Sequence, residues 1–265
     1  MMNDFHGKAV LITGGTRGIG LATGLAFGRQ GAECVLTSKW GSADEGEIRA
    51  AFAAAGAPAP MLVDADVANH DDTMQLLGEM KKRWGHVEAF ISNVGFGHVV
   101  KELDDYVLRA LFTSIEYSAW PLVEYTRRIH EVFGTYPRYV IGLSSGGPDH
   151  YHTNYDFVAA AKAVLETFCK YLNHRLFEED VRINVLRPRF VKTESLRSTL
   201  GDEFEAFVER FDKTHPWVSL EETANAILGL CSGLMDGVSG QIITLDHGAF
   251  FSDNLMRIYA ESKTI

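Results

Sequence analysis

TGGTRGIG, the stretch Thr13–Gly20, directly follows the short apolar run KAVLI at Lys8–Ile12 and precedes a segment of helical composition, LATGLAFGRQG. Its glycines Gly14, Gly18 and Gly20 allow a sharp turn and a close approach of the backbone to a bound pyrophosphate. The helix that starts in this stretch would offer unpaired backbone N–H groups to the anion. A glycine motif is specific only when it stands between a strand and a helix, so this stretch predicts a dinucleotide-binding fold.

Six further apolar segments follow along the chain, and helical patterns separate them. We expect strands at 33–37, 60–67, 87–93, 138–145, 182–188 and 241–246. Strands that alternate with helices favour a parallel sheet covered on both faces, with right-handed crossovers. The predicted fold is therefore α/β: a single doubly wound Rossmann domain over residues 1–265, with a seven-stranded parallel sheet and helices on both faces. Such sheets bind their ligands at the carboxyl ends of the strands.

The composition bounds the class of protein. The chain has 265 residues, 46% of them hydrophobic, and a formal net charge of −10 at pH 7. Nucleic acid and anionic membrane surfaces require a basic face, so neither is expected as a partner. No apolar stretch is long enough to span a bilayer, and the first residues lack the pattern of a signal peptide. Cys34, Cys169 and Cys231 have no metal-ligand spacing and are interpreted as buried residues in a reducing compartment, so a cytoplasmic location is expected.

Tyr155 and Lys162 are seven residues apart in a segment of helical pattern. On a helix of about 3.6 residues per turn, positions i and i+7 lie nearly one above the other. A Tyr hydroxyl can donate a proton, and a nearby Lys ammonium makes that hydroxyl more acidic. We interpret the pair as catalytic. The alternative is that Tyr155 is an aromatic side chain packed at the start of a helix.

The end of the second predicted strand is where dinucleotide-binding folds distinguish the ribose 2′-position. NAD enzymes place an acidic residue there, but this chain has Ser38 and Lys39, with Arg17 inside the glycine turn. Two cations and no acid favour a 2′-phosphate, so the predicted cofactor is NADP(H) rather than NAD(H). Arg17 is the stronger candidate, because Lys39 has the alternative of being a solvated surface lysine.

Together these motifs resemble the short-chain dehydrogenase/reductase family over nearly the whole chain. Asp66-Val67 resembles the family's adenine-contacting pair, SNVG at Ser92–Gly95 its Asn-Asn-Ala-Gly motif, and Pro188–Thr193 the loop that covers the nicotinamide. The resemblance implies a cofactor site that consists of Gly14, Thr16, Arg17, Gly18, Ile19, Gly20, Ser38, Lys39, Asp66, Val67, Asn93, Gly95, Lys162, Pro188, Val191 and Thr193.

One departure from the family pattern indicates the reaction. Most members have Tyr-x3-Lys, but the residue four before Lys162 is Val158, and the available hydroxyl belongs to Tyr155. Tyr-x6-Lys resembles the enoyl-thioester reductase branch, in particular the NADPH-using enoyl-acyl-carrier-protein reductases and the cyclohexenylcarbonyl-CoA reductase group. Three helical residues displace the Tyr by about 4.5 Å, the order of shift needed when hydride goes to the β-carbon instead of the carbonyl carbon. Ser145 stands where ketone reductases have a catalytic Ser, and we expect it as a third catalytic residue.

The resemblance implies an NADPH-dependent enzyme that reduces the C=C bond of an α,β-unsaturated acyl thioester on acyl-carrier protein or coenzyme A, in fatty-acid or polyketide biosynthesis. Two alternatives stay open: a ketoreductase or other carbonyl reductase of the family, and a non-catalytic NADP(H)-binding protein. Ser114 replaces the Asn that supports the family's proton relay, and Arg189 replaces the Gly of its Pro-Gly. Both departures give weight to the non-catalytic alternative, and Ser114 slightly weakens the ketoreductase alternative.

The expected substrate contacts are Tyr151, Phe96 and Arg189. A basic run in this acidic chain would attract the acyl-carrier protein or the phosphates of coenzyme A, and its alternative is a solvated loop edge. The run consists of Arg187, Arg189, Lys192 and Arg197.

Residues 203–217 are predicted to be a mobile substrate flap. Its apolar side chains can line the substrate site or make ordinary core contacts. They are Phe204, Phe207, Phe211 and Trp217.

Two further features concern metal binding and assembly. His150 and His152 with a neighbouring Asp make a poor site without further ligands, so no metal is predicted. Residues 248–265 form a C-terminal extension past the family's usual end, and their apolar side chains suggest a helix that packs on a neighbouring subunit or covers the pocket. The resemblance implies a homotetramer or a homodimer.

Overall fold

The computed structural model describes residues 4–39, 44–211, 217–251 and 253–263. Its centre is one sheet of seven parallel strands in the order β3-β2-β1-β4-β5-β6-β7. The strands are β1 (Ala9–Ile12), β2 (Glu33–Ser38), β3 (Met61–Asp64), β4 (Val87–Ser92), β5 (Tyr139–Leu143), β6 (Arg182–Pro188) and β7 (Ile242–Leu245). Each strand coincides with a segment predicted to be one, within a few residues at the ends, so the predicted fold class is confirmed.

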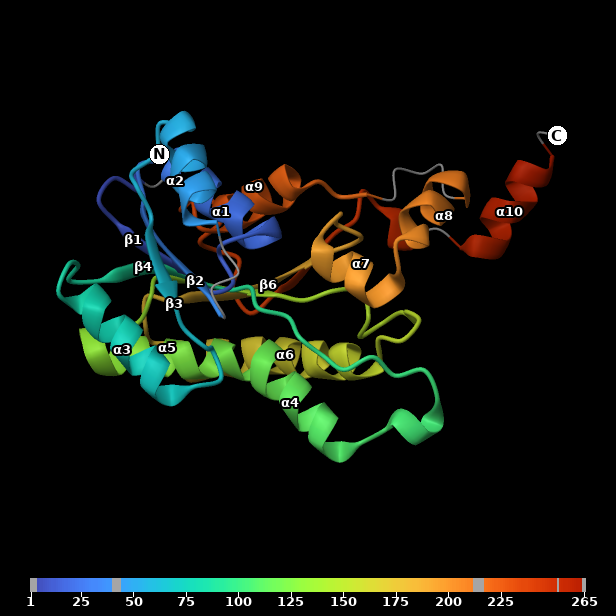
Figure 1. Cartoon of the computed structure of the whole chain (residues 1–265), viewed down its shortest axis with the longest axis horizontal. Helices are drawn as coiled ribbons and strands as arrows, with labels where there is room; N and C mark the ends of the chain where they lie inside the picture. The colour runs from blue at the N-terminus through green and yellow to red at the C-terminus, as the bar shows by residue number, and fades with distance from the viewer. Residues whose placement is uncertain (1–3, 40–43, 212–216, 252, 264–265) are drawn as a thin grey trace.

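Helices cover both faces of the sheet (Figure 1). One face carries α1 (Gly18–Gly28), α2 (Glu45–Ala54) and α9 (Leu220–Leu230). The other carries α3 (His70–Lys81), α4 (Leu108–Ser118), α5 (Trp120–Phe133) and α6 (Asp156–Arg175). The segment after β6 forms α7 (Glu194–Leu200) and α8 (Glu203–Phe211), and the chain ends with α10 (Asn254–Ser262). Within the described ranges, no helix has the length and apolar character needed to cross a membrane.

Two hydrophobic cores lie on either side of the sheet. Alternate strand residues point to opposite faces, so Val10 and Ile12 of β1 join the core under α1, α2 and α9, whereas Leu11 joins the core of α3, α5 and α6. Burial on both faces explains why the strands are continuous apolar runs. Cys34 and Cys169 are buried in these cores as free thiols. The strand order reverses between β1 and β4: β2 and β3 are added on one side of β1, and β4 to β7 on the other. Such a switch point places a ligand-binding crevice at the carboxyl ends of these parallel strands.

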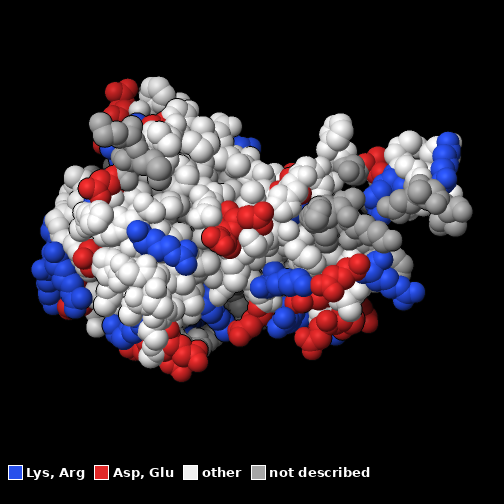
Figure 2. All heavy atoms as spheres, turned by 90° about the horizontal axis from the view of Figure 1, so that it is seen from above, with Lys and Arg blue, Asp and Glu red and all other residues white. Residues whose placement is uncertain are grey.

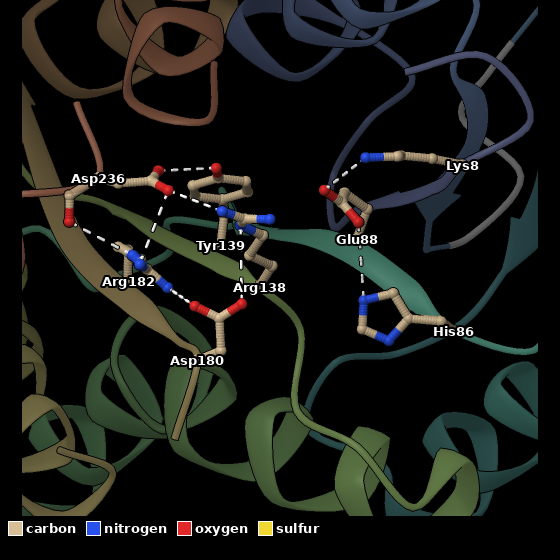
Figure 3. A network of polar contacts seen from close by, with 8 residues as sticks. All are labelled: Lys8, His86, Glu88, Arg138, Tyr139, Asp180, Arg182 and Asp236. Carbon is tan, nitrogen blue, oxygen red and sulfur yellow. Dashed lines mark hydrogen bonds and ion pairs between the residues drawn. The ribbon is translucent and has the colours of Figure 1, made fainter. Parts of the chain in front are cut away.

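Ion pairs join the amino ends of β5 and β6 at the opposite edge of the sheet (Figure 3). Asp236 accepts hydrogen bonds from Nη2 of Arg138 (2.7 Å) and from the hydroxyl of Tyr139 (2.8 Å), and Nη2 of Arg182 lies 3.7 Å from the same carboxylate. Burial acts to raise the pKa of Asp236, but the hydrogen bonds from Tyr139 and Arg138 and the nearby guanidinium charges hold it below its ordinary value of 3.8. The folded protein therefore stabilises the ionised form of Asp236.

Replacing Asp236 with Asn should lower the free energy of unfolding at neutral pH by about 1 to 3 kcal/mol, because Arg138 and Arg182 would lose their shared anion. The pKa of Asp236 is lower in the folded than in the unfolded protein. The stabilisation is therefore complete above the unfolded pKa and is lost as the pH falls through the folded pKa. Urea unfolding curves of the two proteins should converge in acid. Asp64→Asn, a change at an exposed acid, is the control, and an Asp236 effect that stays constant with pH would contradict the prediction.

Candidate active site

The glycine turn between β1 and α1 is a closely packed backbone cradle. Gly14 and Gly18 have left-handed φ angles of 61° and 52°, which favour glycine. A Cβ atom on Gly20 would overlap the carbonyl oxygen of Gly14 and lie 2.8 Å from Nδ2 of Asn93. Asn93, just after β4, donates from this amide to the carbonyl oxygens of Thr13 (3.1 Å) and Gly14 (3.0 Å). The turn thus has no room for a side chain at position 20, and its backbone can approach a pyrophosphate closely at the N-terminus of α1.

The segment after β6 lies against this turn. Thr193 caps α7 by accepting a hydrogen bond from the backbone N–H of Leu196 (3.1 Å), and its methyl carbon is 3.5 Å from the Cβ position of Gly18. A cavity of about 150 Å³ lies between this segment, α7 and the residues that follow β5. The predicted site residues that line it are Ile19, Ser145, Tyr155, Pro188, Arg189, Val191 and Thr193.

Tyr155 and Lys162 lie at the start of α6, as the spacing predicts. Tyr155 is the residue directly before the helix, and its hydroxyl forms a hydrogen bond with Ser145. Burial raises the pKa of Tyr155, and the Ser145 hydrogen bond opposes this rise. Nζ of Lys162 donates to the carbonyl oxygen of Leu143 (2.7 Å) and lies 3.5 Å from the Cβ position of Gly95. Burial lowers the pKa of Lys162 to about 8, against the opposing charge of Glu166.

Val158 packs closely against Gly97, in the segment that follows β4. A Cβ atom on Gly97 would overlap a methyl group of Val158 and lie 3.3 Å from the hydroxyl of Ser114. Ser114 is fully buried, and its hydroxyl donates back to the carbonyl oxygen of Ala110 on the same helix (2.8 Å). A larger Tyr side chain at position 158 would have to displace this packing, and the Tyr that lines the cavity is Tyr155.

His152 and Phe190 also line the cavity, and neither was predicted to be a site residue from the sequence. The ring of His152 is 5.4 Å from that of Tyr155 and 5.6 Å from that of Phe190. Burial lowers the pKa of His152, and the charges of His150 and Arg189 lower it further. A single His in a loop gives no sequence signal for such a position. The imidazole is thus favoured in its neutral form beside the Tyr155 ring.

Two of the predicted substrate contacts lie elsewhere. The side chain of Tyr151 is 85% exposed and that of Phe96 43% exposed, and neither lines the cavity. Phe96 packs against the ring of Tyr117 on α4, at a centroid distance of 5.5 Å. Arg189 is the predicted substrate contact that the structure brings to the cavity wall.

The cations predicted to bind a 2′-phosphate both have acidic partners. Lys39, after β2, forms an ion pair with Asp66 and donates to the hydroxyl of Tyr117 (2.6 Å), which in turn donates to Asp66 (3.1 Å). Burial acts to raise the pKa of Asp66, but the hydrogen bonds from Lys39 and Ala68 hold it below its usual value. Arg17 pairs with Glu194 of α7 at 2.7 Å, and both side chains are largely exposed. Tyr117 was not predicted to be part of this region.

The remaining predicted cofactor residues are distributed along the same edge. Thr16 is buried in the glycine turn, and Ser38 ends β2. Val67 is buried beside Asp66.

The basic run does not form an open patch. Arg187 is buried, whereas Lys192 pairs with Glu209 (2.7 Å) and Arg197 with Glu205 (2.9 Å), both acids of α8. On the face that Figure 2 presents, basic and acidic side chains lie intermixed over the described residues. These pairs leave less positive charge to attract a carrier than the sequence suggests.

The aromatic residues of the predicted flap pack on one another. Phe204 lies 5.1 Å from Phe190 and 6.4 Å from Trp217, measured between ring centroids. Phe207 is 55% exposed. Residues 212–216 and the side chain of Phe211 lie outside the described part of the flap.

The C-terminal extension reaches the rim of the cavity through one side chain. Phe250 stacks on His150 at 4.2 Å, and its ring lies 2.7 Å from the Cβ position of Gly146, a lining residue. The helix α10 that follows projects from the body of the protein with Leu255 and Met256 exposed (Figure 1). No group of three metal-ligating side chains occurs among the residues that the structure describes.

Comparisons with known proteins find relatives over nearly the whole chain. A family model described as Enoyl-(Acyl carrier protein) reductase matches residues 14–249. The chain is 24% identical over 259 residues to the NADH-dependent enoyl-acyl-carrier-protein reductase FabI of Aquifex aeolicus, which covers 93% of both chains. It is 26% identical over 269 residues to versicolorin reductase 1 of Aspergillus parasiticus, covering 94% of this chain and all of that one.

Solved structures share the fold. A short-chain dehydrogenase of Burkholderia cenocepacia in complex with NADP superposes with a TM-score of 0.79 at 19% identity, over 94% of this chain and 100% of that one. A 7α-hydroxysteroid dehydrogenase complexed with NADH and 7-oxo glycochenodeoxycholic acid gives a TM-score of 0.82 at 22% identity, over 94% of this chain and 98% of the other.

Proposed function

The chain belongs to the short-chain dehydrogenase/reductase family, in the group described as enoyl-(acyl carrier protein) reductase, and we propose that it reduces the C=C bond of an α,β-unsaturated acyl thioester with NADPH. The observation that carries this proposal is the position of the hydroxyl. Tyr155 lines the cavity, whereas the position used by most of the family holds Val158, which packs against Gly97. The Tyr155 hydroxyl comes from three residues before position 158. This displacement suits a thioester oxygen, which lies further from the carbon that accepts hydride than a ketone oxygen does.

Each group of the site has a role in this reaction. A dihydronicotinamide held at this edge would supply hydride to the β-carbon of the substrate. Tyr155 then donates a hydrogen bond to the thioester oxygen as it becomes an enolate oxygen, and Ser145 orients the phenol. Lys162 holds a positive charge near the developing anion and binds the ribose hydroxyls, because its ammonium group lies between Leu143 and Gly95 at the carboxyl edge. The α-carbon proton comes from Tyr155 or from solvent.

The function is tested by NADPH oxidation with a crotonyl thioester and, separately, with an acetoacetyl thioester. Turnover of the crotonyl substrate supports the proposal. Turnover of the acetoacetyl substrate without the crotonyl one would overturn it in favour of a ketoreductase. The similarity to versicolorin reductase 1 supports that second candidate. The presence of the Tyr hydroxyl at residue 155 instead of residue 158 favours the enoyl thioester reductase.

The proposed cofactor is NADPH, because no acid ends β2 and Arg17 stands exposed in the glycine turn. Lys39 is less available, since it is held by Asp66 and Tyr117. FabI of Aquifex aeolicus is NADH-dependent, so titration of this chain with each dinucleotide tests the proposal.

Arg17→Ala should weaken NADPH binding about tenfold or more and leave NADH binding nearly unchanged, because a charge-assisted contact to the 2′-phosphate is worth about 1.5 to 3 kcal/mol. Fluorescence titration with each dinucleotide measures both constants. Arg29→Ala, at the other end of α1, is the matched control and should change neither. An unaltered ratio of NADPH affinity to NADH affinity in Arg17→Ala would mean that other residues bind the 2′-phosphate.

The carrier and the assembly are also proposals. Arg189, at the cavity wall, is the proposed contact to the acyl thioester, and acyl-carrier protein or coenzyme A is its proposed carrier. The enzyme is proposed to act as a homotetramer or a homodimer, and apolar side chains exposed on and near α4 and α10 support self-association. They include Leu103, Leu108, Phe112, Leu255, Met256 and Ile258.

A further inference from the structure

Arg187 is a buried arginine next to the proposed catalytic centre, and the proposed mechanism gives it no role. It stands near the end of β6, one residue before Pro188 of the cavity wall, and is 7% exposed. Its Nε and Nη2 donate to the two carboxylate oxygens of Glu166, at 3.0 Å and 2.6 Å. Its Nη1 donates to Asp149, in the loop that leads to Tyr155. A bidentate pair of this kind fixes both groups in direction as well as in distance.

Glu166 lies one helical turn after Lys162 on α6, and residues four apart on a helix are neighbours on its surface. It is 8% exposed and also accepts a hydrogen bond from the hydroxyl of Ser144 (2.6 Å), whose residue lines the cavity. Lys162 is itself buried, with Nζ bound to the carbonyl oxygen of Leu143. A buried carboxylate without Arg187 would have this ammonium group as its neighbouring cation, and burial makes such a pairing strongly favourable.

We infer that Arg187 is a positioning residue: by holding both oxygens of Glu166, it keeps that carboxylate off Lys162 and leaves the ammonium group at the carboxyl edge of the sheet. The inference rests on the proposed role of Lys162 in binding the cofactor ribose. It adds a cation that neither the glycine motif nor the Tyr-x6-Lys pattern contains.

We expect the Lys162 pKa to shift in opposite directions when Arg187 or Glu166 is replaced. Removing Arg187 leaves the negative charge of Glu166 unbalanced, which favours the ammonium form and draws it along α6 away from the cofactor. Removing the charge of Glu166 takes away the carboxylate that favours the ammonium form of Lys162 and leaves Arg187 with Asp149 as its acidic partner, so the ammonium form is disfavoured. Asp149 contacts Arg187, and its charge is unchanged in both variants. Ser144, which contacts Glu166, and Tyr155 are uncharged near neutral pH.

The titration of Lys162 tests the inference directly. With ε-¹³C-labelled lysine and an assignment from Lys162→Arg, NMR should show the Lys162 pKa raised by about one pH unit in Arg187→Met and lowered by a similar amount in Glu166→Gln. The double variant should return toward the wild-type value, and Arg187→Lys, which keeps the charge, should stay near it. NADPH affinity should fall about tenfold in Arg187→Met, because the ammonium group pairs with Glu166.

Arg182→Met is the matched control, because this arginine lies on the same strand and pairs with Asp180 and Asp236 at the far edge of the sheet (Figure 3). It should destabilise the protein without moving the Lys162 titration. Shifts of the same sign in Arg187→Met and Glu166→Gln, or no shift in either, would overturn the inference. The NMR measurement needs neither cofactor nor substrate. If the wild-type protein does not reduce enoyl thioesters, the proposed function is wrong, but the inference about Arg187 is still tested by the titration. If Arg187→Met fails to fold, Glu166→Gln and the double variant give the direction of the Lys162 pKa shift.

Discussion

Replacing Tyr155 with Phe should lower the turnover of an enoyl thioester by about two to four orders of magnitude while NADPH binds with nearly unchanged affinity. The phenyl ring of Phe would still fill the place of the Tyr155 ring, but the hydroxyl that stabilises the enolate oxygen would be gone. Removal of a single donor to a developing oxyanion typically costs about 10² to 10³ in rate, and loss of proton donation adds to it. Single-turnover measurements of NADPH oxidation separate this chemical loss from any change in binding.

Tyr151→Phe is the control for this experiment. Tyr151 is four residues earlier and 85% exposed, so losing its hydroxyl should change the rate less than about twofold. A second control places the hydroxyl where most of the family has it. Val158→Tyr in the Tyr155→Phe background should not restore the reaction, because the methyl group of Val158 already fills the space against Gly97. An unchanged rate in Tyr155→Phe would remove this residue from the mechanism.

The displaced hydroxyl is supported by several neighbouring residues. Gly97 and Ser114 close the space around Val158, and Ser114 uses its hydroxyl within its own helix. At the other end, Tyr155 precedes α6 and is preceded by Asn154, whose φ of 63° is left-handed. Asn tolerates this conformation better than most residues, so the loop can turn and deliver the phenol to the cavity. The change at residue 158 is thus part of a rearranged site, and a single substitution should not convert it.

The arrangement of the sheet could be predicted from the sequence because its signals are local. The inner strands are buried on both faces, so they appear as apolar runs such as VLI in β1 or INVL in β6. The glycine turn was predictable for the same reason, since left-handed φ angles and close backbone contacts demand glycine at fixed positions. The spacing of Tyr155 and Lys162 is likewise a property of one helix.

The parts that could not be predicted depend on pairs that are distant in the chain. Lys39, Asp66 and Tyr117 come from three elements and meet only after folding. In the basic run, Lys192 and Arg197 look like unpaired charges in the sequence, because their partners Glu209 and Glu205 on α8 come close only after the chain folds. The number of charged residues is known from the sequence, but the ion pairs that they form depend on the folded structure.

Gly20→Ala should abolish measurable dinucleotide binding, with a loss of about two orders of magnitude or more in affinity. The added Cβ would overlap the carbonyl oxygen of Gly14 and approach Nδ2 of Asn93 to 2.8 Å, and both are fixed atoms of the cradle. Relief requires the turn to open, which costs about 1 to 3 kcal/mol in packing and displaces the N–H groups at the start of α1. An affinity loss of tenfold corresponds to about 1.4 kcal/mol, so strain and misplaced donors together account for the expected effect.

Gly78→Ala separates this steric effect from the general consequence of adding a methyl group. Gly78 lies in α3 with no atom within 4 Å of its Cβ position, so alanine there should leave cofactor binding unchanged and stabilise the helix slightly. Equilibrium titration of NADPH fluorescence and thermal unfolding of both variants make the comparison. If Gly20→Ala binds NADPH as tightly as the wild type, the cradle does not hold the pyrophosphate, because a group bound there depends on backbone positions that this methyl must move.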